Sequence, residues 1–229
     1  MLIDAGNVED GENIVDQLKS LNISKIDYLI GTHIHEDHIG GMDKVVEAFD
    51  IGTIYMPYNE NSTAKYYEIL LTSIQKKGLK LTKIEKDSNF SVGDVNCIVK
   101  HVDHTEPEEP NNASIVLQLN YKNHKYLFMG DAEKEVEQNI TWEDIDVLKV
   151  GHHGGKTSST QEFLNQVKPE IGVIQVGEGN SYGHPKDEVL KRFEKMGTRI
   201  YRTDTDGTIH LVDDGENILI EKLEISLDG

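Results

Sequence analysis

The sequence predicts an α/β fold in which two sheets pack face to face with helices outside each sheet, an αββα sandwich. Strand-like and helix-like patterns alternate twice along the 229 residues. Proline and glycine fall singly at expected turns, and no linker, low-complexity run or internal repeat divides the chain. We therefore predict that residues 1–229 form a single domain.

The first half of the chain carries patterns typical of helices and of strands. Helices are expected where apolar residues recur every three or four positions, which occurs over 12–21, from Met42 onward, and over 64–77. Strands are expected over the apolar runs 28–30, 53–56, 79–85 and 95–102. The last two runs are predicted to lie on either side of a turn at 91–94. Cys97, the single cysteine, excludes an intramolecular disulfide and is expected to be a buried apolar residue.

The second half repeats the alternation. Strands are predicted over 114–120, 125–129, 146–150 and 171–176, and again from Arg199 onward with turns at 206–207 and 213–216. Helices are predicted over 160–167 and 185–196, the second of which Gly197 should end. His124 falls in the connection of the hairpin predicted from the strands 114–120 and 125–129. We therefore expect His124 to be an exposed turn residue.

Net charge restricts the partners. The chain has 41 acidic and 23 Lys or Arg residues, a formal charge of −18. Such a surface repels nucleic-acid backbones and anionic membranes, so extended duplex DNA is disfavoured and a small or short anionic substrate is expected. No apolar segment approaches the length of a membrane span, and no secretion signal opens the chain, which favours the cytoplasm. The sequence leaves the oligomeric state open.

A cluster of polar residues follows the strand that ends at Ile30. Within six positions lie His33, His35, Asp37 and His38, before a predicted tight turn at Gly40–Gly41. In an extended chain, side chains two apart point the same way, so His33 and His35 can bind one cation while Asp37 and His38 turn toward a second position. Imidazole nitrogen and carboxylate oxygen are ligands that zinc prefers. The alternative is a solvated loop, but four polar groups at the end of a buried strand favour a metal site.

This His-x-His-x-Asp-His pattern resembles the metallo-β-lactamase superfamily, and other motifs follow in the order of that family. Leu-Ile-Asp-Ala-Gly at 2–6 resembles its first motif, and Leu-Phe-Met-Gly-Asp at 127–131 resembles the motif of its bridging aspartate. Four segments are similar to the soluble hydrolase domain of the ComEC competence DNA-uptake channels: 111–117, 146–155, 182–185 and 202–209. The resemblance implies the metallo-β-lactamase-type αββα sandwich. It also implies that the family's first hairpin of strands precedes the start of this chain.

The resemblance also implies roles for individual residues. Asp4 should brace the metal loop, and Asp131 should bridge two metal ions, although Asp131 could instead cap a helix starting at Ala132. His184 should bind the second ion. The adjacent His152 and His153 should serve the substrate or the leaving group, one of them as proton donor.

The third ligand of the first ion is expected in the loop before Ser114. His101 and His104 compete for this position, and His104 is favoured because a loop residue beyond the strand end can turn toward the metal. The full predicted ligand set is His33, His35, Asp37, His38, His104, Asp131 and His184. We expect two divalent ions, zinc first, with manganese or iron as alternatives.

These expectations define a dinuclear metal-dependent hydrolase. Ions of this kind lower the pKa of water toward about 7, so a nucleophile forms at neutral pH, and Asp37 is expected to orient it. The leading interpretation is a phosphodiesterase or nuclease. The first alternative is hydrolysis of a lactone, thioester or amide, because the same nucleophile attacks a carbonyl carbon. The second is a non-hydrolytic metal-binding or redox domain.

Overall fold

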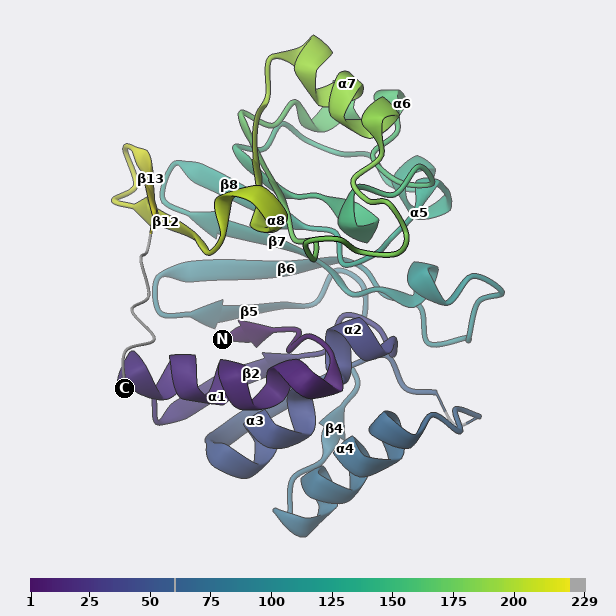
Figure 1. Ribbon diagram of the computed structural model, residues 1–229, viewed down its shortest axis with the longest axis vertical. Coiled ribbons are helices and arrows are strands. Elements are labelled where there is room, and N and C mark those ends of the chain that lie inside the picture. The colour runs from purple at the N-terminus through teal and green to yellow at the C-terminus, as the bar shows by residue number, and fades with distance from the viewer. Residues whose placement is uncertain (60, 223–229) are drawn as a thin grey trace. The chain divides into compact units, whose positions relative to one another are not determined.

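The computed structural model describes residues 1–59 and 61–222 (Figure 1). Its elements are strands and helices in alternation, as the predicted α/β class requires. The contacts divide the chain into two compact units. The first unit comprises Met1–Ser88 and Val99–Ile115, and the second comprises Asn89–Ile98 and the residues from Val116 onward. That residues 1–229 act as a single domain stays a prediction.

The first unit is built on a parallel sheet of four strands in the order β1-β2-β3-β4. The strands are β1 (Leu2–Ile3), β2 (Lys25–Ile30), β3 (Asp50–Tyr55) and β4 (Leu81–Thr82). The helices are the 3-10 turn η1 (Val8–Asp10), α1 (Gly11–Ser20), α2 (Glu36–Ile39), α3 (Met42–Ala48), α4 (Lys65–Lys76) and the 3-10 turn η2 (Pro110–Ala113).

The apolar faces of these helices share one core with the sheet. Val15 of α1, Val46 of α3 and Leu70 of α4 belong to the same buried cluster as Leu29 of β2 and Ile54 of β3. Burying a side chain of this size stabilises the fold by roughly 1.5–3 kcal/mol. The helical spacing read from the sequence is therefore confirmed for all three helices.

The second unit contains most of a seven-stranded sheet in the order β11-β10-β9-β8-β7-β6-β5. Its strands are β5 (Asn89–Val92), β6 (Val95–His101), which enters the first unit at Val99, β7 (Val116–Tyr121), β8 (His124–Phe128), β9 (Val147–Lys149), β10 (Ile171–Ile174) and β11 (Arg199–Arg202). The helices are α5 (Lys134–Gln138), the 3-10 turn η3 (Gly151–Gly154), α6 (Gln161–Val167), α7 (Asp187–Met196) and α8 (Thr203–Asp206). A separate hairpin pairs β12 (Ile209–Asp213) with β13 (Ile218–Lys222).

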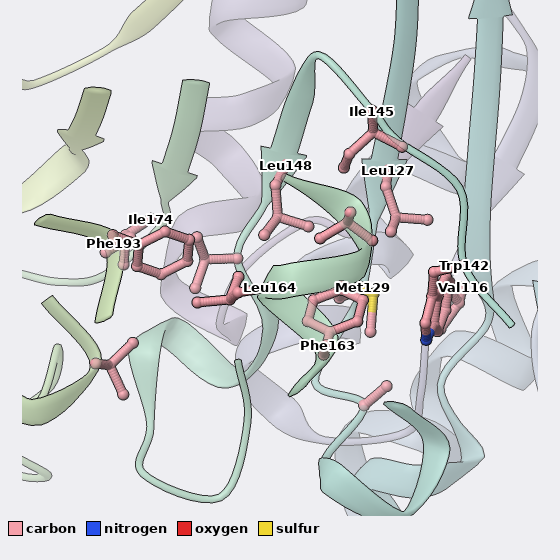
Figure 2. Packing of buried hydrophobic residues seen from close by; sticks show 14 of the residues in the cluster. Val116, Leu127, Met129, Trp142, Ile145, Leu148, Phe163, Leu164, Ile174 and Phe193 are labelled. Carbon is pink, nitrogen blue, oxygen red and sulfur yellow. The ribbon is translucent and has the colours of Figure 1, made fainter. Parts of the chain in front are cut away.

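Figure 2 shows the core of this second unit, where Phe163 and Leu164 of α6 pack on Leu148 of β9. The rings of Trp142 and Phe163 meet edge to face, with centroids 5.1 Å apart. The Trp142 indole N–H donates to the Glu137 carbonyl at 2.8 Å, which satisfies its polar atom inside the core. The strand β9 and the helix α6 therefore share one buried core.

One predicted strand pairing is wrong. The sequence predicts that 79–85 and 95–102 lie on either side of the turn at 91–94. In the structure β4 pairs in parallel with β3, and the strand that pairs antiparallel with β6 across this turn is β5, which the sequence pattern does not predict. The pair Val92↔Val95 encloses a two-residue turn in which Gly93 has φ +56°. Glycine favours such a turn, and it joins the strands on its two immediate sides.

The prediction for His124 is also wrong. His124 lies on β8, paired with Tyr121, and its side chain is only 14% exposed. Its Nδ1 lies 2.8 Å from a carboxylate oxygen of Asp213, whose other oxygen accepts a 2.6 Å hydrogen bond from the Tyr126 hydroxyl. Because the turn contains only two residues, His124 belongs to the ladder, and its side chain contacts the end of β12.

Candidate functional site

In the first unit, two strand ends lie side by side. β1 and β2 are parallel, with Ile3 opposite Ile30, so Asp4 begins its loop beside the loop that contains the histidine cluster. One carboxylate oxygen of Asp4 accepts the Thr32 backbone N–H at 2.7 Å. The other accepts the Thr32 hydroxyl at 2.9 Å and lies 2.7 Å from His38 Nδ1. Asp4 therefore braces this loop, as the resemblance predicts.

These contacts indicate which ring nitrogen of His38 and of His33 carries hydrogen. A carboxylate only accepts, so His38 Nδ1 donates to Asp4 and leaves Nε2 with its lone pair. The Thr32 hydroxyl gives its hydrogen to Asp4, so its oxygen can accept from His33 Nδ1 at 3.2 Å. His33 Nε2 then faces His35 Nδ1 at 3.0 Å, and one nitrogen of His33 lies within 4.8 Å of one of His38. This is a donor set that fits a divalent cation.

The backbone after His35 is a short helix and not the predicted tight turn. The turn α2 places Asp37 beside His38, with a carboxylate oxygen 3.9 Å from His38 Nε2. Gly40 and Gly41 have ordinary helical φ values of −57° and −87°. A side chain at Gly41 would collide with the Ala5 carbonyl. The glycine is therefore needed for close backbone approach and not for a left-handed conformation.

The acidity of Asp4 follows from its surroundings. Burial acts to raise the pKa of Asp4, but the charge and hydrogen bond of His38 and the Thr32 N–H bring the pKa below its ordinary value. The carboxylate therefore stays ionised and can hold the imidazole hydrogen in place. An acid that orients a histidine from behind is the usual outer partner of a metal-binding imidazole.

The two candidates for the third ligand, His101 and His104, make different hydrogen bonds, and neither lies in a cluster of possible metal ligands among the described residues. His101 Nε2 donates to the Asn112 carbonyl at 2.8 Å, and burial lowers its pKa. His104 Nε2 donates to the Ile84 carbonyl at 2.8 Å, and its Nδ1 is buried without a hydrogen-bond partner among the described residues. In those residues, no group of three ligand atoms within 4.8 Å includes either histidine. The choice of His104 stays a prediction.

In the second unit, the predicted residues Asp131, His152 and His153 and their neighbour Gln175 follow three adjacent parallel strands. Asp131 lies just after β8, the pair His152–His153 after β9, and Gln175 directly after β10. Carboxyl ends of parallel strands meet at one edge of a sheet, which is the usual place for a site in such sheets. The alternative role of Asp131 as a helix cap is excluded, because α5 begins at Lys134, with Glu133 at the N-cap position.

Asp131 is buried, and each of its carboxylate oxygens lies within ion-pair distance of a nitrogen atom. It is 2% exposed. One oxygen lies 3.3 Å from His153 Nε2, and the other lies 3.9 Å from the ammonium group of Lys149, which also donates to the Gly130 carbonyl at 3.0 Å. His153 Nδ1 donates to the Gln175 carbonyl at 2.7 Å, so Nε2 is the nitrogen presented to the carboxylate. An imidazole and a carboxylate in this arrangement fit a divalent ion.

His152 has a different set of partners. Its Nδ1 lies 3.0 Å from a carboxylate oxygen of Glu133 and 3.1 Å from the Thr157 hydroxyl. The Thr157 hydroxyl donates to the same Glu133 oxygen at 2.7 Å. The two neighbouring histidines are thus oriented by separate carboxylates.

The side chains of His152 and His153, which have different partners, extend from a backbone of unusual conformation. His152 and His153 both adopt the left-handed region, with φ +49° and +51°, which costs on the order of 1–3 kcal/mol for each residue. Gly154 follows with φ +77°, where a Cβ would lie 2.6 Å from Pro185 Cβ. The Ser158 hydroxyl donates to the Gly151 carbonyl at 2.8 Å and helps to hold the segment.

His184 lies on a loop that Asn180 fixes. The Asn180 side chain accepts the His184 backbone N–H at 2.9 Å and donates to the His184 carbonyl at 2.7 Å. The rings of His184 and His152 meet edge to face with centroids 5.4 Å apart. Burial, followed by the nearby His152 and Lys186, lowers the pKa of His184. A neutral imidazole is the form that binds metals, which agrees with the ligand role predicted for His184.

Several residues that orient the predicted side chains are not singled out by the sequence: Thr32, Glu133, Lys149, Thr157, Gln175 and Asn180. Glu133 had a visible signal, because it stands two positions after Asp131 in Gly-Asp-Ala-Glu. Thr157 lies 24 residues from its partner Glu133 in a polar run, where nothing local distinguishes it from Ser158 or Ser159. Contacts at such separation depend on the order of the strands.

In the part of the chain that the structure describes, none of the helices has the length and apolar character needed to cross a bilayer.

Comparison with known proteins supports the resemblance to the metallo-β-lactamase superfamily. The family model of the metallo-beta-lactamase superfamily matches residues 1–178. ComE operon protein 3 of Bacillus subtilis is 32% identical over 204 residues, which are 87% of this chain and 26% of that protein. Competence protein ComA of Neisseria gonorrhoeae is 27% identical over 219 residues, 91% of this chain and 28% of that protein. The chain thus spans about a quarter of the length of these relatives.

Solved structures agree on the fold. A putative metal-dependent hydrolase from Parabacteroides distasonis superposes with a TM-score of 0.52 and 17% identity, over 80% of this chain and 78% of that one. CmlA, a diiron β-hydroxylase from Streptomyces venezuelae, gives 0.53 and 12% identity, over 79% and 44% of the two chains. The predicted fold and the predicted resemblance are confirmed: this chain belongs to the metallo-β-lactamase superfamily and is homologous to competence proteins of the ComEC family.

Proposed function

We propose that this chain is a dinuclear metal-dependent hydrolase whose substrates are phosphodiesters, that is, a phosphodiesterase or nuclease. The superfamily consists largely of metal-dependent hydrolases. The observation that carries the proposal is the arrangement within each unit. His38 presents Nε2 because Asp4 holds its Nδ1 hydrogen, and His153 presents Nε2 because the Gln175 carbonyl holds its Nδ1 hydrogen.

The proposed ligands are those of the sequence analysis: His33, His35, Asp37, His38, His104, Asp131 and His184. Zinc is the first candidate, because its preferred ligands are neutral imidazole and carboxylate, and manganese and iron are the alternatives. The diiron centre of CmlA belongs to that protein, and at 12% identity the likeness concerns the fold alone. Metal identity is therefore a matter for elemental analysis.

The bound ions would activate water and polarise the phosphorus–oxygen bond. The side chains of the protein would do the rest. The Asp37 carboxylate is proposed to orient the attacking water, and Asp4 keeps His38 in one tautomer through the Nδ1 hydrogen. The histidines that follow β9 are proposed to act on the leaving group and on Asp131.

The charge of −18 favours a compact substrate. Long polyanions meet a repulsive surface at low ionic strength, whereas a single phosphodiester or a short oligonucleotide meets mainly the local field of the ions. We therefore propose that small phosphodiesters and short single strands are cleaved faster than duplex DNA. A cytoplasmic location also stays a proposal from the sequence.

The test combines metal content with a substrate panel. The protein is expressed with zinc, manganese or iron, analysed for bound metal, and assayed on bis(p-nitrophenyl) phosphate, a lactone and single-stranded DNA. We expect about two ions per chain and turnover of the phosphodiester. His35→Ala should reduce both metal content and turnover. The matched control is His210→Ala, which removes a histidine from the β12–β13 hairpin and should change neither.

The outcomes separate the alternatives. Turnover of the lactone without the phosphodiester would replace the proposal with carbonyl hydrolysis. Two bound ions without any hydrolysis would favour a metal-binding or redox domain. Absence of stoichiometric metal after growth in each metal would refute the proposal as a whole.

A further inference from the structure

The adjacent histidines 152 and 153 have opposite environments, and this difference assigns them different tasks. His153 directs Nε2 to Asp131 at 3.3 Å. His152 directs Nδ1 to the Glu133 carboxylate at 3.0 Å. We propose that Glu133 is the positioning residue of His152 and that His152, not His153, supplies the proton to the leaving group. This inference rests on the proposed phosphodiester hydrolysis and names the residue that completes it.

The hydrogen bonds around Glu133 determine the tautomer of His152. The Thr157 hydroxyl has one hydrogen, which it gives to Glu133 at 2.7 Å. The two groups near His152 Nδ1, the Glu133 carboxylate and the Thr157 oxygen, are then both acceptors. A bare nitrogen there would face two lone pairs, so Nδ1 must carry the hydrogen. Nε2 is the nitrogen that remains for proton transfer.

The positioning groups are rigid, whereas the histidine is reachable. Glu133 is 6% exposed and occupies the N-cap position of α5. Thr157 is tied to the start of the same helix, because its carbonyl accepts the Lys134 N–H at 2.9 Å. The His152 side chain, by contrast, is 25% exposed. A buried carboxylate therefore orients a partly open imidazole from behind, which is the arrangement that proton transfer at Nε2 requires.

His153 is a poorer candidate for the same task. Its Nδ1 hydrogen is held by a neutral carbonyl, that of Gln175, and its Nε2 lies against Asp131. A proton on that nitrogen would be shared with the carboxylate and directed away from a leaving group. We infer that His153 holds Asp131 in place.

The proposed step balances. The oxygen of water bonds to phosphorus, and the bond from phosphorus to the leaving oxygen breaks with its electron pair staying on that oxygen. The leaving oxygen takes the Nε2 proton of His152 in its imidazolium form, and the product departs as an alcohol. The attacking water loses one proton to solvent, and a proton from solvent restores Nε2. The Nδ1 hydrogen stays on His152, bonded to Glu133, throughout.

The test is a double-mutant cycle on the metal-loaded protein with two substrates. The variants are Glu133→Ala, His152→Ala and the pair. The substrates are bis(p-nitrophenyl) phosphate, with a good leaving group, and a dinucleoside monophosphate, whose alkoxide needs a proton. On the dinucleotide, His152→Ala should lower kcat about 10²–10⁴-fold. Glu133→Ala should lower kcat about 10–100-fold, as loss of an outer partner does.

Three readouts distinguish positioning from general damage. The double variant should have a kcat no lower than that of His152→Ala alone. The decreases in kcat caused by Glu133→Ala and by His152→Ala should both be smaller on the nitrophenyl ester, and the metal content of each variant should equal that of the wild type. Glu133→Gln, which keeps an acceptor for Nδ1, should restore most of kcat. The matched control is Glu135→Ala on the same helix, which removes the same charge from the surface and should leave kcat unchanged.

A spectroscopic arm keeps the inference testable without turnover. Imidazole nitrogen NMR of the zinc-loaded protein should show the hydrogen of His152 on Nδ1 in the wild type, and a mixture of tautomers in Glu133→Ala. Independent, additive losses in the cycle, or an unchanged tautomer in Glu133→Ala, would overturn the inference. A wild type that cleaves no phosphodiester would instead refute the proposed function, while the NMR result would still decide whether Glu133 positions His152.

Discussion

Replacement of Asp4 by alanine tests whether the hydrogen bonds that Asp4 makes with Thr32 and His38 control metal affinity. The carboxylate accepts the Thr32 N–H and the Thr32 hydroxyl and lies 2.7 Å from His38 Nδ1. Thr32 is 1% exposed and His38 is 2% exposed. Asp4→Ala therefore removes the acceptor of three donors that water reaches poorly: the Thr32 N–H, the Thr32 hydroxyl and the His38 Nδ1–H.

The magnitude follows from these contacts. Each buried donor that loses its acceptor costs about 1–3 kcal/mol, so three donors give roughly 3–9 kcal/mol. Removing Asp4 also relieves the cost of burying a carboxylate, which places the expected loss of unfolding free energy in the lower half of that range. Without Asp4, His38 no longer has a fixed tautomer, and the affinity for zinc should fall about 10–100-fold.

The assay is urea unfolding of the metal-free protein together with calorimetric titration by zinc. Asp4→Asn keeps the size of the side chain and one acceptor oxygen, so its loss should be intermediate. The matched control is Asp27→Ala, which removes an exposed acid of β2 paired with Lys25 at 2.6 Å and should alter neither quantity measurably. Zinc affinity within twofold of wild type in Asp4→Ala would refute the reasoning, even if stability fell.

Four further predictions follow from the same structure. Asp131→Ala should lose both ions, because Asp131 is the ligand proposed to bridge them, and retention of one ion in elemental analysis would contradict the bridging role. His184→Ala should lower metal occupancy, whereas His152→Ala should not, and equal losses would show that the roles are misassigned. Any cleavage of plasmid DNA should rise when salt is added from about 0.01 M, where the Debye length is about 30 Å, and a steep fall would reveal a basic DNA-binding surface. Asp213→Asn should lower stability at neutral pH and reduce the stability that the protein loses in acid. Burial acts to raise the pKa of Asp213, but hydrogen bonds from Tyr126 and Gly215 hold this pKa below its ordinary value. The stabilisation by the Asp213 carboxylate is therefore full above the unfolded pKa and is lost as pH falls through the folded pKa, which urea unfolding at several pH values measures.

The sequence determined the parts of this protein that depend on near neighbours. Three helices of the first unit were predicted because their apolar residues recur at helical spacing. The histidine cluster can be recognised because its four members lie within six consecutive positions after one strand, so local geometry alone brings them together. The family followed from the same motif and from others in the expected order, and its model matches residues 1–178.

Tertiary structure decided the pairings that are distant in sequence. Nothing local separates the exposed turn expected of His124 from the partly buried contact that it makes with Asp213, 89 residues later. Likewise, the two adjacent histidines look equivalent in the sequence, and only the parallel order of β8, β9 and β10 gives one of them to Asp131 and the other to Glu133. Periodicity reports which face of an element is buried, whereas the partner of a polar side chain depends on which strands become neighbours, and that is set by packing of the whole sheet.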